Sequence, residues 1–200
     1  ALRLLRKKLE YAAKKQPDPY ARDLVACDDH TRLAYEVACK SMVLLKNENQ
    51  CLPLDKHKLK KIAVLGKLAK QANLGDKGSS CVRPPYVVTP LEGIKDRAGA
   101  GVDVIYYNGA DPARAAQIAG SADATIVVAG LTKKEEGEYI PIPRPIGGDR
   151  MKLGLSEKDE QLIQAVANQD TPCIVALVGS SAITMESWKD RVDEIGRAHV

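Results

Sequence analysis

Aromatic side chains are scarce in this 200-residue sequence, which has no phenylalanine and whose seven tyrosines and single tryptophan make up 4% of the residues. A core must therefore consist of aliphatic side chains, since hydrophobic residues still reach 44%. No apolar run approaches the ~20 residues of a transmembrane helix. The basic first 15 residues also lack the apolar stretch of a signal peptide. These absences exclude a membrane span and favour a soluble domain.

The five cysteines form no recognisable metal or disulfide framework. Their number is odd, no two make a CxxC pair, and the three histidines do not cluster with them. Zinc sites need closely spaced ligands, so we expect no metal and mostly buried, free thiols. Free thiols favour the cytoplasm, while the alternatives of periplasm and secretion stay open.

The net charge of +4 comes from one short segment. Residues 1–15 hold six basic side chains against one glutamate, +5 in total, so the rest of the chain sums to −1. Nucleic-acid binders spread basic residues over a face, often with stacking aromatics. The distribution favours a solvated helix face, and we expect no nucleic-acid or membrane partner.

Four short apolar runs, each ending in glycine, predict strands that are buried on both faces. They are IAVLG, DVIYYNG, ATIVVAG and CIVALVG, at residues 62–66, 103–109, 124–130 and 173–179. Helical patterns lie between them at residues 89–98, 111–122 and 156–169, and further helices are predicted at 1–15 and 30–45. The alternation predicts an α/β fold: an open, doubly wound, mostly parallel sheet with helices on both faces.

In such sheets, ligands bind beyond the carboxyl ends of the strands. The loop after the first run contains GDKGSS but matches neither GxGxxG nor GxxxxGK[ST], the nucleotide fingerprints. Its glycines and serines could hold an anion through backbone amides. A non-catalytic α/β module that binds a sugar or an anion is therefore one function to consider.

The loop after the third run, residues 130–155, holds the strongest candidates for chemistry. Glu135, Glu136 and Glu138 gather there, and Tyr139 follows directly. Long irregular loops in compact domains are commonly functional. Apolar neighbours raise the pKa of a carboxylate, as a general acid near neutral pH requires. The alternative is a solvated run of charges on a surface loop.

Five blocks, in order, resemble the second domain of family 3 glycoside hydrolases, the β-glucosidase-like enzymes. They are KSMVLLKNENQCLPL, IAVLG with GDKGSSCVRPPYVVTPLEGI, EGEYIPIPRPIGGDRMKLGL, SEKDEQLIQAV and PCIVALVGSSAITMESW. The resemblance covers residues 36–193, and residues 1–15 resemble the helix that closes the family's first domain, a barrel.

The resemblance implies a retaining exo-β-glycosidase of β-glucosidase or β-xylosidase type, with no cofactor. Its substrate would be a β-linked oligosaccharide or an aryl glycoside. In the family, a barrel aspartate attacks the anomeric carbon and a glutamate of the second domain serves as acid and base, with the carboxyls about 5–5.5 Å apart. A barrel needs ~250 residues, so the nucleophile would lie on an N-terminal barrel outside this sequence. The fragment alone should be inactive.

The family's acid/base glutamate stands in a Gly-Glu-Gly-Tyr setting, where this chain has Glu-Gly-Glu-Tyr. Glu136 precedes a glycine as in the family, whereas Glu138 precedes Tyr-Ile and a later Gly-Asp-Arg, as in members with a long loop. We favour Glu138, keep Glu136 as the alternative, and expect Glu135 to be a solvated neighbour. The resemblance also suggests substrate contacts for Asp76, Ser79, Ser80 and Tyr139, with an ordinary Gly/Ser turn as the equal alternative for the GDKGSS residues. Asp149 and Arg150 are further candidates for substrate contact, but we favour a structural ion pair that holds the return of the loop.

The expected organisation has three parts. Residues 1–29 would end the preceding barrel domain and form a linker, and residues 30–193 would form the α/β domain, incomplete at its C-terminal side. The last seven residues, EIGRAHV, can be encoded by GAG ATC GGA AGA GCA CAC GTC, which contains a common short-read sequencing adapter. We therefore expect residues 194–200 to be adapter read-through.

Overall fold

The computed structural model describes residues 1–14, 21–75, 82–137 and 150–198. It divides into two compact units, Ala1–Glu36 and Val37–Val200. The first unit contains helix α1 (Leu2–Ala12), the short 3-10 helix η1 (Arg22–Leu24) and the start of α2 (Asp28–Ser41). No residue of α1 is buried, so the predicted N-terminal helix forms with its leucines exposed.

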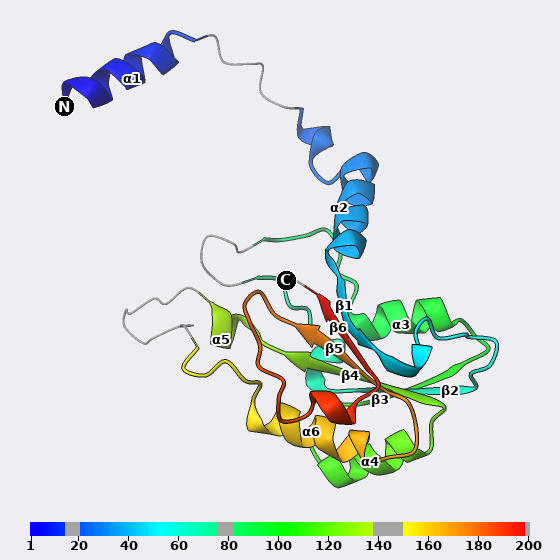
Figure 1. Cartoon of the computed structure of the whole chain (residues 1–200). Helices are drawn as coiled ribbons and strands as arrows, with labels where there is room; N and C mark the ends of the chain where they lie inside the picture. Colours follow the sequence, from blue (N-terminus) through cyan, green and yellow to red (C-terminus); the bar gives the residue numbers. More distant parts are fainter. Residues whose placement is uncertain (15–20, 76–81, 138–149, 199–200) are drawn as a thin grey trace. The chain divides into compact units, whose positions relative to one another are not determined.

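The second unit is built on one six-stranded sheet (Figure 1). Its strands are β1 (Val43–Asn47), β2 (Lys61–Leu65), β3 (Asp103–Tyr107), β4 (Ala124–Gly130), β5 (Cys173–Val178) and β6 (Glu194–Ala198). The strand order is β1-β6-β5-β4-β2-β3, and only the β1–β6 pair is antiparallel. The four apolar runs form β2 to β5, which confirms the predicted mostly parallel α/β sheet.

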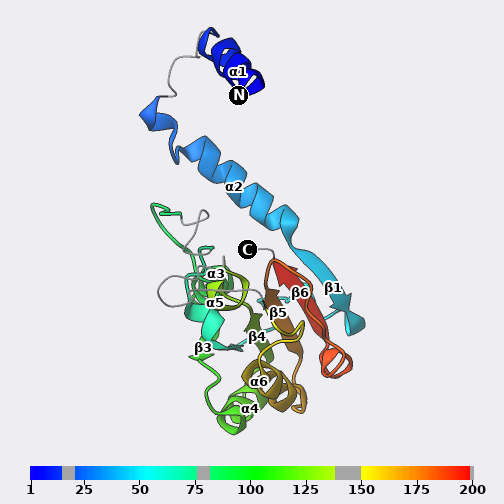
Figure 2. The same cartoon turned by 90° about the vertical axis from the view of Figure 1, so that its left-hand side faces the viewer.

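Helices cover both faces of the sheet (Figures 1 and 2). Helices α4 (Pro112–Gly120) and α6 (Glu157–Ala167) lie on one face and α3 (Pro90–Ala98) on the other. Side chains of β4 alternate between the two apolar clusters: Val127 belongs to the first and Val128 to the second. This two-sided burial explains why the strands are apolar throughout. The remaining elements are α5 (Lys133–Glu136), η2 (Glu48–Gln50), η3 (Lys67–Lys70) and η4 (Lys189–Arg191).

The helix predicted over residues 30–45 is correct only as far as Ser41. The following segment VLLKN forms β1 and pairs with β6. Helical periodicity continues through these residues, but Val43 and its neighbours also suit a strand, and pairing with a sheet edge decides between the two. Pairing with a strand far along the chain cannot be read from local periodicity.

Two glycines at the carboxyl ends of strands let neighbouring strands approach closely. Gly66 has φ +98° and Gly130 has φ +149°, both in the region that favours glycine. A Cβ atom at either would collide with a backbone oxygen of the next strand, that of Val128 or Val178. The loops after β2, β4 and β5 are consequently brought together at one edge of the sheet.

Candidate functional site

Most of the residues predicted for catalysis or substrate contact lie outside the described residues. These are Glu138, Tyr139, Asp76, Ser79, Ser80 and Asp149. The structure describes Glu136 and Arg150, which flank the segment that contains Glu138. Both lie in the connection between β4 and α6, beyond the carboxyl end of β4, where the topology predicts a site.

The sequence places Glu136 through a short capped helix. Thr132 caps α5, and its backbone N–H and hydroxyl donate to the Glu135 carboxylate at 2.9 and 2.7 Å. This reciprocal capping box fixes the first turn of α5 directly after β4. Glu135 was expected to be a solvated neighbour; it is exposed, but it also caps the helix. Glu136 follows at the end of α5 and points to the neighbouring loop.

The Glu136 carboxylate accepts hydrogen bonds from two consecutive serines in the loop after β5. Ser180 donates its backbone N–H and its hydroxyl to Oε2, both at 2.9 Å. Ser181 donates its backbone N–H to Oε1 at 3.2 Å, and its hydroxyl donates to the same oxygen. Consecutive backbone N–H groups of this kind form an anion-binding nest. All four donors come from one turn, so the carboxylate is held from a single side.

Arg150, 14 residues after Glu136 in the chain, contacts the same turn. Its Nη2 donates to the Ser181 hydroxyl at 2.5 Å and to the Ala182 carbonyl at 2.6 Å. Its Nε lies 3.7 Å from Oε1 of Glu136, and the two side chains are only 10% and 13% exposed. Arg150 also donates to the Leu153 carbonyl at 3.3 Å.

These contacts set the ionisation of Glu136. Burial by itself raises its pKa, but the hydrogen bonds from Ser181 and Ser180 outweigh burial, and the pKa lies below the usual 4.5. A carboxylate held in its charged form is a poor proton donor at neutral pH. The geometry suits Glu136 to binding a positive charge and N–H or O–H donors.

Sequence reasoning did not single out Ser180 and Ser181. The signal was available, because both directly follow Gly179 at the carboxyl end of the last predicted strand. Two hydroxyl residues after a strand-ending glycine offer several donors at the edge where ligands bind. Which side chain they bind depends on the adjacency of β4 and β5, which only the folded sheet supplies.

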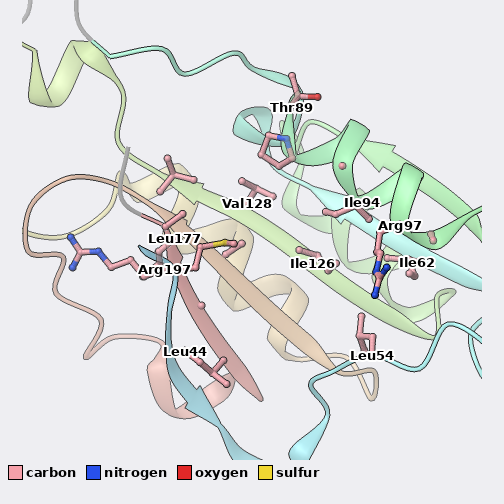
Figure 3. Close-up of a pocket in the computed structure, with 18 of the residues that line it drawn as sticks. Leu44, Leu54, Ile62, Thr89, Ile94, Arg97, Ile126, Val128, Leu177 and Arg197 are labelled. Atoms are coloured by element: carbon pink, nitrogen blue, oxygen red, sulfur yellow. The ribbon is translucent and has the colours of Figure 1, made fainter. Parts of the chain in front are cut away.

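A separate cavity of about 910 Å³ lies on the α3 face of the sheet (Figure 3). Its lining is mainly aliphatic, from residues such as Leu44, Leu54, Ile62, Ile94, Ile126 and Val128. Neither Glu136 nor Arg150 lines it. Sugars present many hydroxyl groups that need hydrogen-bond partners, so this apolar cavity is a poor match for a carbohydrate.

Two further searches concern only the described part of the chain. No group of three or more histidine, cysteine, aspartate or glutamate side chains is arranged there to hold a metal ion. None of the helices in those ranges is both long and apolar enough to span a bilayer.

Comparison with known proteins identifies the family. Residues 42–199 match the glycosyl hydrolase family 3 C-terminal domain. The chain is 32% identical over 181 residues to a β-xylosidase of Formosa agariphila, covering 84% of this chain and 24% of that protein. It is 33% identical over 183 residues to thermostable β-glucosidase B of Acetivibrio thermocellus, covering 86% of this chain and 23% of that protein.

Solved structures agree with the sequence relatives. The β-D-glucoside glucohydrolase of Trichoderma reesei superposes with a TM-score of 0.75 at 27% identity, covering 94% of this chain and 28% of that one. A β-glucosidase of Chaetomella raphigera gives 0.73 at 28% identity, covering 87% and 26%. The chain spans about a quarter of the length of the curated relatives it matches. The resemblance inferred from five sequence blocks is confirmed: the chain belongs to glycosyl hydrolase family 3 and carries the C-terminal domain of that family.

Proposed function

We propose that this chain supplies the general acid/base of a retaining exo-β-glycosidase and that Glu138 is that residue. The observation that carries the assignment is the state of Glu136. Its carboxylate already accepts four hydrogen bonds, and its pKa is lowered. Glu135 caps α5. These contacts favour structural roles for Glu135 and Glu136, and Glu138 directly precedes Tyr-Ile and a later Gly-Asp-Arg, as in family members with a long loop.

The proposed reaction has two steps. An aspartate on a barrel domain of the same polypeptide attacks the anomeric carbon while protonated Glu138 gives its proton to the departing glycosidic oxygen. The resulting glycosyl ester is then hydrolysed by water, whose proton returns to the Glu138 carboxylate. Net retention follows because the anomeric carbon is inverted twice. The β-xylosidase and β-glucosidase relatives favour terminal β-linked xylose or glucose as substrates.

In this proposal, some of the other predicted site residues contact the substrate and one has a structural role. Asp76, Ser79, Ser80 and Tyr139 keep the proposed role of contacting sugar hydroxyls. Arg150 does not, because its guanidinium contacts the Ser181 and Ala182 turn. Asp149 keeps its proposed substrate contact.

We also propose that residues 1–29 belong to the end of the barrel domain and the linker that follows it. The exposed leucines of α1, such as Leu5 at 53% and Leu9 at 62%, support this because an amphipathic helix normally buries its apolar side. The 200-residue chain should show no hydrolysis of aryl β-glucosides. Activity in the purified chain that disappears in Glu138→Gln would contradict the two-domain mechanism.

Leaving-group dependence in a polypeptide that carries the barrel tests the assignment of Glu138. Glu138→Gln should lower kcat/KM by about 10²–10⁴-fold on alkyl glycosides, whose leaving oxygen needs a proton. It should lower the first step far less on 4-nitrophenyl glycosides, whose leaving group departs unprotonated. Glu135→Gln is the matched control, since it removes the same charge three residues away. Equal losses on both substrate classes would overturn the assignment.

A further inference from the structure

We propose that Glu136 is a positioning residue which, together with Arg150, clamps the chain on either side of the segment 138–149, at residues 136 and 150, onto the turn Ser180–Ala182. This inference rests on the proposed function, because the segment matters for catalysis only if it carries the acid/base. It assigns Glu136 a role different from proton transfer and gives Ser180 and Ser181 a part in the site.

The first argument is that the two ends of the segment meet at one residue. Ser181 uses a single hydroxyl for both: it donates to Oε1 of Glu136 and accepts from Nη2 of Arg150 at 2.5 Å. The Arg150 Nε also lies 3.7 Å from the same Oε1. Residues 136 and 150 are thus tied together although 13 residues separate them in the chain.

The second argument is that the turn is fixed to the sheet. Leu131, at the exit of β4, donates its backbone N–H to the Val178 carbonyl at 2.9 Å, so the exits of β4 and β5 are held side by side. Gly179 donates its N–H to the Ala198 carbonyl of β6 at 3.3 Å. Sites supported by strands are held more precisely than sites on loops alone. The turn therefore offers Glu136 and Arg150 a firm attachment.

The third argument concerns charge. Glu136 and Arg150 are nearly buried and of opposite sign. Removal of one partner leaves the other with a poorly compensated charge in a site that water reaches only in part. The pair therefore favours one arrangement of the segment's ends over alternatives in which either side chain turns outward.

The fourth argument is proximity to the proposed acid/base. Only Gly137 separates Glu136 from Glu138, and Gly137 is itself buried. A displacement at Glu136 has little chain in which to be absorbed before it reaches Glu138. Because displacement of a catalytic group by about 1 Å can cost 10²-fold in rate, the clamp should act on kcat more than on KM.

The pH dependence of kcat/KM in a polypeptide that joins this chain to its barrel tests the clamp. Glu136→Gln keeps the size of the side chain but removes the charge that binds Arg150. We expect a fall in kcat of tenfold or more with KM within about threefold, and an alkaline limb that is still present, because that limb reports the acid/base, which remains. Glu135→Gln, the control, should stay within about twofold of the unmodified protein.

A second pair of variants keeps the test decisive if Glu136→Gln folds poorly. Ser181→Ala removes only the shared hydroxyl and should lower kcat in the same direction. The double variant should lose less than the product of the two single losses, because both changes break the same contact. Independent, fully multiplicative losses would overturn the clamp.

Glu138→Gln, measured beside these variants, separates the two proposals. If Glu138→Gln loses the alkaline limb while Glu136→Gln behaves like the Glu135→Gln control, the clamp is wrong and the proposed function stands. If Glu136→Gln loses the limb and Glu138→Gln keeps it, Glu136 is the acid/base and both proposals are overturned. If Glu138→Gln loses the limb and Glu136→Gln lowers kcat but keeps it, both are supported.

Discussion

Two glutamates near the strands of this sheet have opposite surroundings. Glu136, beyond the carboxyl end of β4, accepts hydrogen bonds from two serines and lies beside Arg150. Glu194, the first residue of β6, is fully buried, and within the described part of the chain its carboxylate oxygens have no hydrogen-bond partner other than the neighbouring Cys51 thiol. The two side chains carry the same group, so their difference comes from the donors around them.

The sheet itself explains the difference. Glu194 lies between β1 and β5, opposite Asn47 and Ile174, where backbone N–H groups are used for strand pairing. Beyond the strand ends the backbone N–H groups are free of the ladder, and a turn such as the one at Ser180 can direct several of them at one carboxylate. A charged group is therefore well placed at the carboxyl edge of this sheet and poorly placed inside it.

Glu194 is also the first residue of the segment predicted to be adapter read-through. Residues 194–198 form β6, which pairs with β1 and β5, and the family match extends to residue 199. The origin of residues 194–200 stays a prediction. Genomic sequence that runs through this segment without an adapter would contradict it.

The largest expected effect on stability comes from replacing Glu136, whose carboxylate accepts four hydrogen bonds. Glu136→Ala leaves the Ser180 and Ser181 donors and the Arg150 guanidinium without their acceptor, and should lower the free energy of unfolding by about 2–3 kcal/mol. Urea unfolding of the chain measures it. The exposed Glu135 offers Glu135→Gln as a control that should change little. A loss below about 0.5 kcal/mol would show that the Glu136 contacts are not stabilising.

The opposite change in the free energy of unfolding is expected when the buried Glu194 is replaced. Glu194→Val removes a buried carboxylate whose only neighbouring hydrogen-bond partner in the described residues is the weak Cys51 thiol, and introduces a β-branched side chain into a strand, so the free energy of unfolding should rise by about 1–2 kcal/mol. Glu194→Gln, which removes the charge but keeps a polar group, should gain less. Destabilisation by Glu194→Val would mean that Glu194 has a stabilising partner.

The pH dependence of stability sharpens the comparison further. The folded-state pKa of Glu136 is lowered from 4.5, so its contribution is complete above the unfolded-state pKa and is lost as the pH falls through the folded-state value. The stability difference between the unmodified chain and Glu136→Gln should therefore be largest near pH 7 and shrink below pH 4.5. A difference that grows on acidification would contradict the lowered pKa.

The smallest expected effect concerns the chemical reactivity of the Cys51 thiol, which interacts with Glu194. Burial, then the carboxylates of Glu194 and Asp193, raise the pKa of the Cys51 thiol to about 12. Since the thiolate is the reactive form, iodoacetamide at pH 8 should label Cys51 more slowly than the exposed Cys39. Glu194→Gln should accelerate labelling of Cys51 and leave Cys39 unchanged. An unchanged labelling rate at Cys51 in Glu194→Gln would show that the Glu194 carboxylate does not influence the reactivity of the thiol.

The sequence predicted what depends on local patterns. The four strands and the helices between them follow from apolar runs, helical periodicity and the rules of parallel sheets. The assignment of residues 43–45 to a helix failed because the strand partner of this segment, β6, lies about 150 residues away. The contact of Glu136 with Ser180 and Ser181 could not be predicted either, because it joins loops that follow two different strands.

The division of labour between Glu136 and Glu138 is tested most directly by product analysis with azide. In a retaining mechanism, loss of the acid/base leaves a glycosyl ester that water attacks slowly without a base. Azide is already an anion and needs no base to attack that ester. With a 4-nitrophenyl glycoside and a polypeptide that carries the barrel, Glu138→Ala should form the β-glycosyl azide, and Glu136→Ala should form only the free sugar. Glycosyl azide from Glu136→Ala, and none from Glu138→Ala, would contradict the account.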